Sequence, residues 1–166
     1  MSEGAEDSPH EMLQTLGFQR IVELGGGRAS LEFLAGRHMC HSGGVVQGGF
    51  VSGWIDAAMA HAVIGLHGER GDHDVSPISL ELKISFFAPA RPGLVTAEGW
   101  IELNGRSTCF AEGRLLDAAG QVVAKGTSTI RLLSRARVEA ASQAAAVLTS
   151  APGMQAGVRD LDPLRR

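Results

Sequence analysis

The feature that most constrains this chain is an apolar segment, Phe50 to Ile64, in which only three side chains are polar, Asp56 among them. Glycine pairs precede it, and Gly68 follows it. The pattern predicts a helix over residues 48–67, closed by Gly68, that is apolar nearly all round. Such a helix must be surrounded on most sides, so the rest of the chain has to wrap around it.

The chain after this helix is typical of antiparallel strands. The segment "ISLELKISF" alternates strictly between apolar and polar side chains, which predicts a half-buried strand. Asn104–Gly105 is a strong hairpin signal, and Asp117–Gly120 marks another turn. The apolar face of the alternating strand is expected to carry Ile78, Leu80, Leu82, Ile84 and Phe86.

Shorter elements flank this part of the chain. The segment "SPHEMLQTLG" predicts a short helix with Ser8 as its N-cap, and residues 18–35 predict two strands joined by a glycine turn. An Ala-rich stretch after Ser134 predicts a further surface helix. We expect three parts: a tail and short helix over 1–17, a main domain over 18–133 and an Ala-rich extension over 134–166.

Together these elements predict an α+β fold, in which a curved antiparallel sheet of five or six strands wraps one central helix. The open edges of such a sheet favour pairing with a second copy of the chain.

Composition excludes several classes of partner. The net charge is −3, Tyr is absent and no long basic block occurs, which argues against nucleic-acid binding. The acidic N-terminus has no apolar signal core, and neither cysteine belongs to a CxxC pair. We therefore expect a cytoplasmic protein without a membrane span.

His38, Cys40 and His41 lie close together, but no carboxylate or second cluster completes a zinc site, so no metal is expected.

Asp56 admits two interpretations. It can be a structural acid. Burying an unpaired carboxylate costs several kcal/mol, so such an acid would have to be hydrogen-bonded across the core. Alternatively it is a general base or a nucleophile, with the N–H of Gly48 at the positive helix end stabilising an oxyanion. The two residues are eight positions apart, about 12 Å along one helix. If they form one site, two chains must supply it, which predicts an obligate dimer.

The pattern "GGVVQGGFVSGWIDAAMA" resembles the PaaI-type hotdog-fold acyl-CoA thioesterases. Many members carry His-Gly-Gly or Gln-Gly-Gly, followed by an Asp eight residues after the first of those glycines. The segments "SLELKISFFAPARPG", "NGR" and "VVAKGTSTIRL" extend the resemblance in the expected order, from about Leu31 to Leu133. It implies hydrolysis of an acyl-CoA to a free acid and coenzyme A, in dimers that often pair into tetramers. No separate cofactor is implied, because coenzyme A is part of the substrate.

The resemblance also assigns roles to single residues. It implies that Gly48 binds the oxyanion and that Asp56 of the other subunit activates water or attacks the thioester. Ser79 falls where some members hold the water with Ser or Thr. His41 falls where many members have an Asn near the thioester carbonyl, and it is expected to act there by donating a hydrogen bond, although His departs from the pattern. The implied substrate-binding residues are Gln47, Gly49, Phe87, Ala88, Pro89, Arg91, Gly105 and Arg106.

Other functions compete with this one. A non-catalytic acyl-CoA-binding or regulatory hotdog module would share the fold, and a thioesterase acting on acyl carrier protein would share the chemistry. Asp56 and His61 also form the D-x4-H spacing of hotdog hydratases. On a helix these side chains diverge by about 140°, which argues against a hydratase. The acyl group itself stays open between aryl-acyl and short or medium chains.

Overall fold

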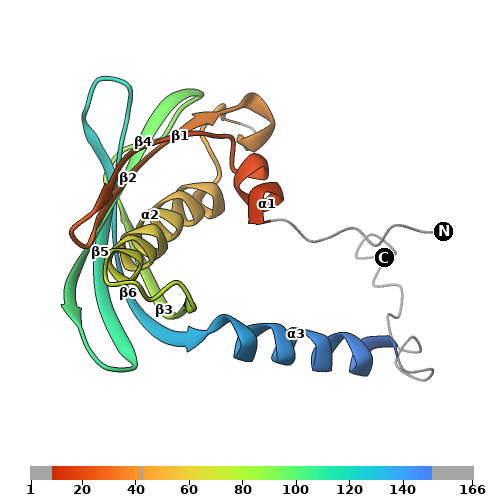
Figure 1. Ribbon diagram of the computed structural model, residues 1–166. Helices are drawn as coiled ribbons and strands as arrows, with labels where there is room; N and C mark the ends of the chain where they lie inside the picture. Colours follow the sequence, from red (N-terminus) through yellow and green to blue (C-terminus); the bar gives the residue numbers. More distant parts are fainter. Residues whose placement is uncertain (1–8, 42, 151–166) are drawn as a thin grey trace.

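The computed structural model describes residues 9–41 and 43–150 of the 166-residue chain. Figure 1 shows the arrangement of its helices and strands. In chain order these are α1 (Pro9–Thr15), β1 (Phe18–Gly25), β2 (Arg28–Ala35), the 3-10 helix η1 (Arg37–Met39), α2 (Gly48–Glu69), β3 (Val75–Phe86), β4 (Gly93–Asn104), β5 (Thr108–Leu116), β6 (Val122–Ser134) and α3 (Arg135–Ser150).

In the described residues the strands form one antiparallel sheet in the order β1-β2-β4-β5-β6-β3. The strands curve around α2, which lies against one face of the sheet (Figure 1). The predicted α+β fold, with a long central helix wrapped by an antiparallel sheet, is confirmed. β3 lies at one edge, although it follows α2 directly in the chain, so its outer side is open to a further strand.

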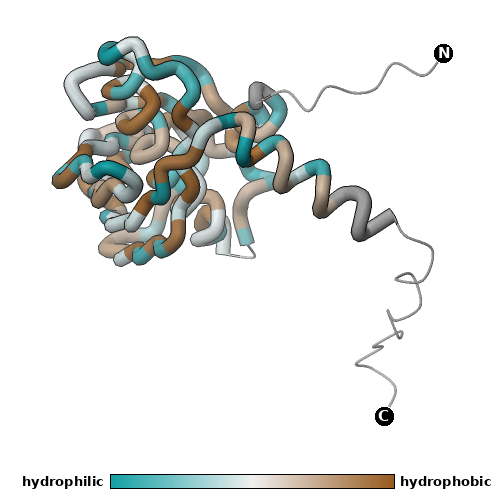
Figure 2. The backbone as a smooth tube through the Cα atoms, turned by 60° about the horizontal axis from the view of Figure 1, so that its bottom comes forward, coloured by the Kyte–Doolittle hydropathy of each residue, from teal (hydrophilic) through white to brown (hydrophobic). Residues whose placement is uncertain are grey.

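The core lies between α2 and the inner face of the sheet. Trp54, Ile55 and Met59 of α2 are fully buried, as are Leu31, Phe33 and Leu115 of the sheet. Figure 2 shows the hydrophobic segments gathered in the body of the protein, with α3 leaving it as a helix of mixed character. Of the described helices, only α2 is long and apolar enough to span a membrane. Half of its most apolar window is buried under the sheet, so it is the core helix and indicates no membrane.

The close contact between α2 and β4 depends on Gly99. A Cβ atom added there would lie 2.5 Å from the backbone carbon of Ala58 and from the backbone nitrogen of Met59. The backbone of the helix thus rests directly on the backbone of the sheet. At this contact β4 can carry no side chain.

The alternation predicted for the strand after the central helix holds for Ile84 and Phe86 but is wrong before the bulge at Leu80. The register of β3 against β6 shifts between Ser79 and Glu81, which leaves Leu80 in a β-bulge. Ser79 bonds to α2, while Ile84 packs against the core, so these residues share the inner face although they are five positions apart. Ile78 therefore points outward, away from the helix.

The predicted end of the central helix is also wrong by a few residues. Gly68 does not close the helix but lies inside it, and α2 continues to Glu69. The left-handed conformation occurs instead at Gly71, with φ of 77°, where its N–H bonds to the carbonyl of Gly68. The helix therefore ends at the polar loop that contains Gly71, not at Gly68.

The predicted short N-terminal helix and Ala-rich helix correspond to α1 and α3. Ser8 and residues 151–166 lie outside the described residues. α3 continues directly from β6 and extends away from the sheet (Figure 1). Its first N–H, on Arg135, bonds to the carbonyl of Asp74 at 2.8 Å. This bond ties the root of α3 to the start of β3.

We predict opposite effects of alanine at two of these glycines. Gly99→Ala places a methyl group into the backbone of α2 and should lower the free energy of unfolding by about 1–3 kcal/mol or more. Gly68→Ala is the matched control, because its Cβ would meet only the His73 ring at an ordinary 3.7 Å. Alanine is a better helix former, so this change should raise the free energy by up to about 0.5–1 kcal/mol. Urea unfolding followed by circular dichroism measures both; a neutral Gly99→Ala would contradict the contact.

Candidate functional site

The N-terminus of α2 is fixed by local hydrogen bonds. Gln47 caps the helix, and its side-chain oxygen accepts the N–H of Gly49 at 2.5 Å. The preceding residues bond to η1 and to the β3–β4 loop, through the N–H of Gln47 to Met39 and that of Val46 to Ala90. Among the described residues the N–H of Gly48 has no acceptor. The first N–H of the core helix is therefore available at its positive end.

An open groove of about 420 Å³ lies at this helix end. It runs between the segment that leads into α2 and the loop after β3. Most of its surface is apolar, which suits a hydrocarbon group better than a polar one. The residues that line it are Val45, Val46, Gly48, Val51, Phe86, Phe87, Ala88, Pro89 and Ala90.

Asp56 lies on α2 facing the edge strand. The hydroxyl of Ser79 donates to its Oδ1 at 2.6 Å, and Oδ2 has no partner among the described residues. Asp56 is half-buried, and Ser79 is exposed. The carboxylate is thus held by one hydrogen bond at the open edge of the sheet, with its second oxygen unoccupied.

The structure brings Ser79 to Asp56 and leaves Gly48 apart from both. Gly48 and Asp56 lie on one unbroken helix, about 12 Å apart by their eight-residue spacing. The groove at Gly48 also does not include Asp56. A single chain therefore does not assemble the carboxylate and the helix N-terminus into one site.

His41 lies in the turn before α2 rather than in the groove. Its backbone N–H bonds to Val45 at 3.0 Å, and its Nδ1 accepts the N–H of Gly43 at 3.3 Å. The side chain is exposed, and its neighbour Ser42 lies outside the described residues. In this chain His41 thus shapes the loop that precedes the helix.

The two arginines expected to contact the substrate lie at opposite ends of β3. Arg91 is exposed in the loop directly after the groove residues Ala88–Ala90. Arg106 lines a separate depression of about 220 Å³ with His67, Asp72 and Asp74, near the start of β3. Gly105 shapes the turn at that end, where its N–H bonds to the carbonyl of Thr108.

The remaining histidines form no metal site in the described part of the chain, where no group of three His, Cys, Asp or Glu could hold a metal ion. The ring of His61 bonds to the Ala57 carbonyl at 2.7 Å, within its own helix. It therefore turns away from Asp56. The ring of His67 bonds to Asp72 at 3.1 Å.

Sequence reasoning missed five of the nine residues that line the groove: Val45, Val46, Val51, Phe86 and Ala90. Phe86 is the largest of them. Phe86 was assigned to the apolar face of its strand, but its side chain is 55% exposed and stands beside Gly48. Ile84, on the same face, packs against the core, whereas Phe86 lies beyond the core's end. The only signal for this in the sequence is the position of Phe86 at the end of the strand, followed by a second phenylalanine.

Comparison with known proteins gives one family. Residues 43–124 match the thioesterase superfamily. A protein of Saccharolobus solfataricus with the provisional name of an esterase is 28% identical over 121 residues, which cover 73% of this chain and 82% of that protein. A phenylacetic acid degradation-related protein of Ralstonia eutropha is 28% identical, with a TM-score of 0.66 over 77% of this chain and 93% of that one. The PaaI protein of E. coli is 18% identical and shares the fold, with a TM-score of 0.66 over 75% and 85%.

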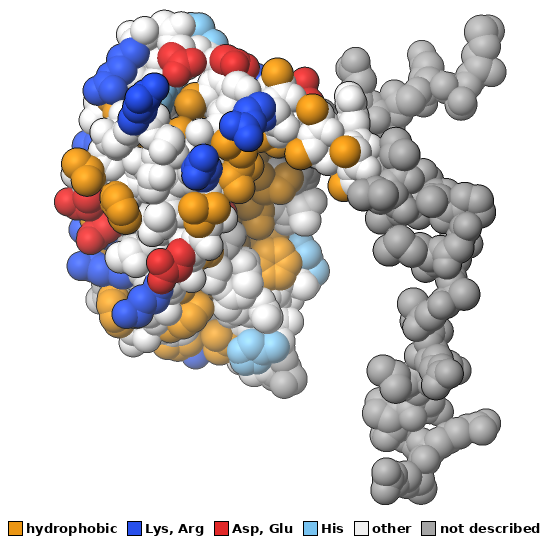
Figure 3. Space-filling model, turned by 90° about the horizontal axis from the view of Figure 1, so that it is seen from below, with side chains coloured by type: hydrophobic (Ala, Val, Ile, Leu, Met, Phe, Trp, Pro, Cys, Tyr) orange, Lys and Arg blue, Asp and Glu red, His pale blue; other side chains and the backbone are white. Residues whose placement is uncertain are grey.

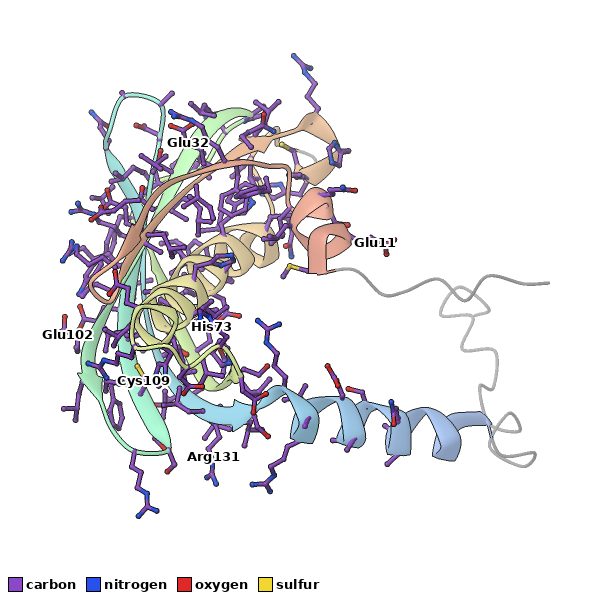
Figure 4. The ribbon with its side chains drawn as sticks, viewed as in Figure 1. Glu11, Glu32, His73, Glu102, Cys109 and Arg131 are labelled. Carbon is purple, nitrogen blue, oxygen red and sulfur yellow. The ribbon has the colours of Figure 1, made fainter. Side chains whose placement is uncertain are left out.

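We predict that the two cysteines differ in reactivity. Cys109 is fully buried between the sheet and α2 (Figure 4), and burial raises the pKa of its thiol. Because the thiolate is the reactive form, Cys109 should resist Ellman's reagent at pH 8 in the native protein. Cys40 is only half-buried and should react. One thiol is expected to react under native conditions and two in guanidinium; Cys40→Ser is the control, and rapid labelling of that variant would contradict the burial.

Proposed function

We propose a thioesterase activity, on the premise that this chain belongs to the thioesterase superfamily and has the PaaI-type hotdog fold. The chain is then a hydrolase that cleaves an acyl-CoA to the free acid and coenzyme A. The observation that supports this most directly is the placement of Asp56. A carboxylate on a largely apolar core helix, held by a single hydrogen bond from Ser79 at an open edge, suits a group that acts on a ligand.

The proposed reaction needs only two groups. The thioester carbonyl oxygen accepts the N–H of Gly48, at the positive end of α2. Asp56 removes a proton from water, whose oxygen attacks the carbonyl carbon to give a tetrahedral oxyanion. The oxyanion collapses, the C–S bond breaks and coenzyme A leaves as a thiolate that takes up the proton. A thiol has a pKa of about 8.5, so its departure does not require a strong general acid.

The proposed site is shared by two copies that pair along β3. The open edge of this strand exposes Leu80, at 62%, and Leu82, at 37%, which a second copy would cover. Added antiparallel, a second β3 would extend the sheet across the two copies. The dimer so formed brings Asp56 of one copy to the helix N-terminus of the other.

The contacts within one chain set the register of this pairing. Ser79 touches Asp56, and Phe86 touches Gly48. Bringing Asp56 to the Gly48 N–H of a second copy therefore places Ser79 opposite Phe86 of that copy. The start of β3 then lies beside the loop after β3 of the other copy. Arg106 and Arg91, which lie far apart in one chain, would meet at the mouth of the shared site and could bind the phosphates of coenzyme A.

The first test is release of free thiol from acetyl-, hexanoyl-, decanoyl-, palmitoyl-, phenylacetyl- and 4-hydroxybenzoyl-CoA. Asp56→Asn keeps the shape of the side chain and one acceptor for Ser79 but removes the base. We expect kcat to fall by about 10²–10⁴-fold, while the oligomer and the thermal unfolding temperature stay unchanged. Binding of acyl-CoA without turnover by the unsubstituted protein would instead support a non-catalytic binding module. Equal turnover by both proteins would rule out Asp56 as the base.

A mixing experiment tests whether two chains supply the site. Gly48→Pro removes the N–H, and the backbone tolerates it, because Pro suits the first helical position and Gln47 has the extended ψ of 136° that a residue before Pro requires. Gly48→Ala is its control, because it also displaces the ring of Phe86 but keeps the N–H. Asp56→Asn and Gly48→Pro should each be inactive alone. Unfolded together and refolded, they should form mixed dimers with one intact site, giving about a quarter of the normal activity for random pairing. Activity that stays at the level of the separate variants would show that one chain carries both groups.

A further inference from the structure

The last inward side chain of β3 stands against the first residue of α2. A Cβ atom built on Gly48 would lie 3.1 Å from Cζ of Phe86 and 3.5 Å from its Cε1. The ring therefore occupies the space beside Gly48 that a side chain would take. The same ring lines the apolar groove at this helix end.

Backbone hydrogen bonds between β3 and β6 hold the backbone of Phe86 in place. Phe86 pairs with Ala124 in the β3–β6 ladder, and the next N–H, on Phe87, bonds to the carbonyl of Val123 at 2.9 Å. The position of the ring therefore follows from the sheet rather than from a loop. A group held this way gives a groove a wall of defined shape.

Phe86 does not belong to the hydrophobic core. Its side chain is 55% exposed in the single chain, and the buried cluster between α2 and the sheet does not include it. Ile84, two residues earlier on the same face, already packs against the end of that cluster. A large apolar ring in this place adds little to core packing, so its size must matter to what enters the groove or to the second copy.

We infer that Phe86 is a specificity-determining residue, whose ring limits the size of the acyl group next to the thioester carbonyl. The inference rests on the proposed function, because it takes the Gly48 N–H as the place of the carbonyl oxygen. A carbonyl there has the ring as its neighbour. The carbon atoms that follow the carbonyl must then pass the ring as they enter the groove, which Val45 and Val51 also line.

The test compares ratios of kcat/KM, because a ratio between two substrates does not depend on the fraction of active protein. Phe86→Ala should raise the ratio of decanoyl-CoA to acetyl-CoA by about tenfold or more, since space for a single methylene can change kcat/KM by about 10–200-fold. Phe86→Trp should lower the ratio below that of the unsubstituted protein. Phe110→Ala is the matched control: Phe110 is 47% exposed on the strand face that points away from α2, and its removal should leave the ratio unchanged.

A double substitution tests the contact itself. Gly48→Ala retains the N–H but forces the ring of Phe86 to move by a few tenths of an ångström. It should therefore lower kcat/KM for acetyl-CoA when Phe86 is present. In the Phe86→Ala background there is no ring to displace, so the same change should cost clearly less. Additive losses in the double variant would contradict a functional contact between the two residues.

The outcomes separate the inference from the proposed function. If the unsubstituted protein hydrolyses no thioester, the proposed function fails and the inference fails with it. If the protein is active but both Phe86 variants leave the ratio unchanged, only the inference is overturned. A role confined to the dimer would lower kcat/KM equally for both substrates and dissociate the oligomer in light scattering, which would also overturn it. If Phe86→Ala dissociates, Phe86→Leu replaces it, because leucine keeps an apolar contact. A ratio of kcat/KM that rises in the intact Phe86→Leu oligomer would support the inference, and an unchanged ratio would overturn it.

Discussion

The rest of the structure depends on the direct contact between the core helix and the inner face of the sheet. At Gly99 the backbone of β4 lies so close to α2 that a single methyl group would overlap the backbone at Ala58 and Met59. Because the helix lies so close to the sheet, the side chains between them are shielded from water, and Trp54, Phe33 and Leu115 are fully buried. It also sets the height of α2 above the sheet, and with it the positions of the two helix features that can do chemistry.

Those two features face different neighbours. The N-terminus of α2 opens into an apolar groove, while Asp56, two turns further on, faces the edge strand β3. An unbroken helix holds them apart, and an open strand edge offers the means to bring them together between copies. In the proposed reaction, the need for a second copy thus follows from the rigidity of the helix.

Figure 3 shows charged side chains spread over the body and a hollowed strip of hydrophobic side chains beside the root of α3.

A single bulge links the sheet to the candidate site. Without the extra residue at Leu80, Ser79 would share the outward face of Lys83 and Ser85, and its hydroxyl could not reach Asp56. The bulge thus allows one strand to place a polar group against the carboxylate at its start and apolar groups against the core and the groove at its end. Bulges that re-aim side chains beside functional sites are a recurrent use of this irregularity.

The sequence by itself determined the parts that depend on local pattern. It identified the apolar helix from Gly48, the antiparallel strands, the turns at Asn104 and Asp117, and Asp56 and Gly48 as the residues most in need of an explanation. Periodicity and turn chemistry are properties of neighbouring residues, so they can be read without the fold. Tertiary structure alone decided the bulge that turns Ser79 inward, the end of α2 beyond Gly68 and the place of Phe86 beside Gly48. Each of these arises from contacts between residues far apart in the chain, where packing against α2 or β6 outweighs local preference.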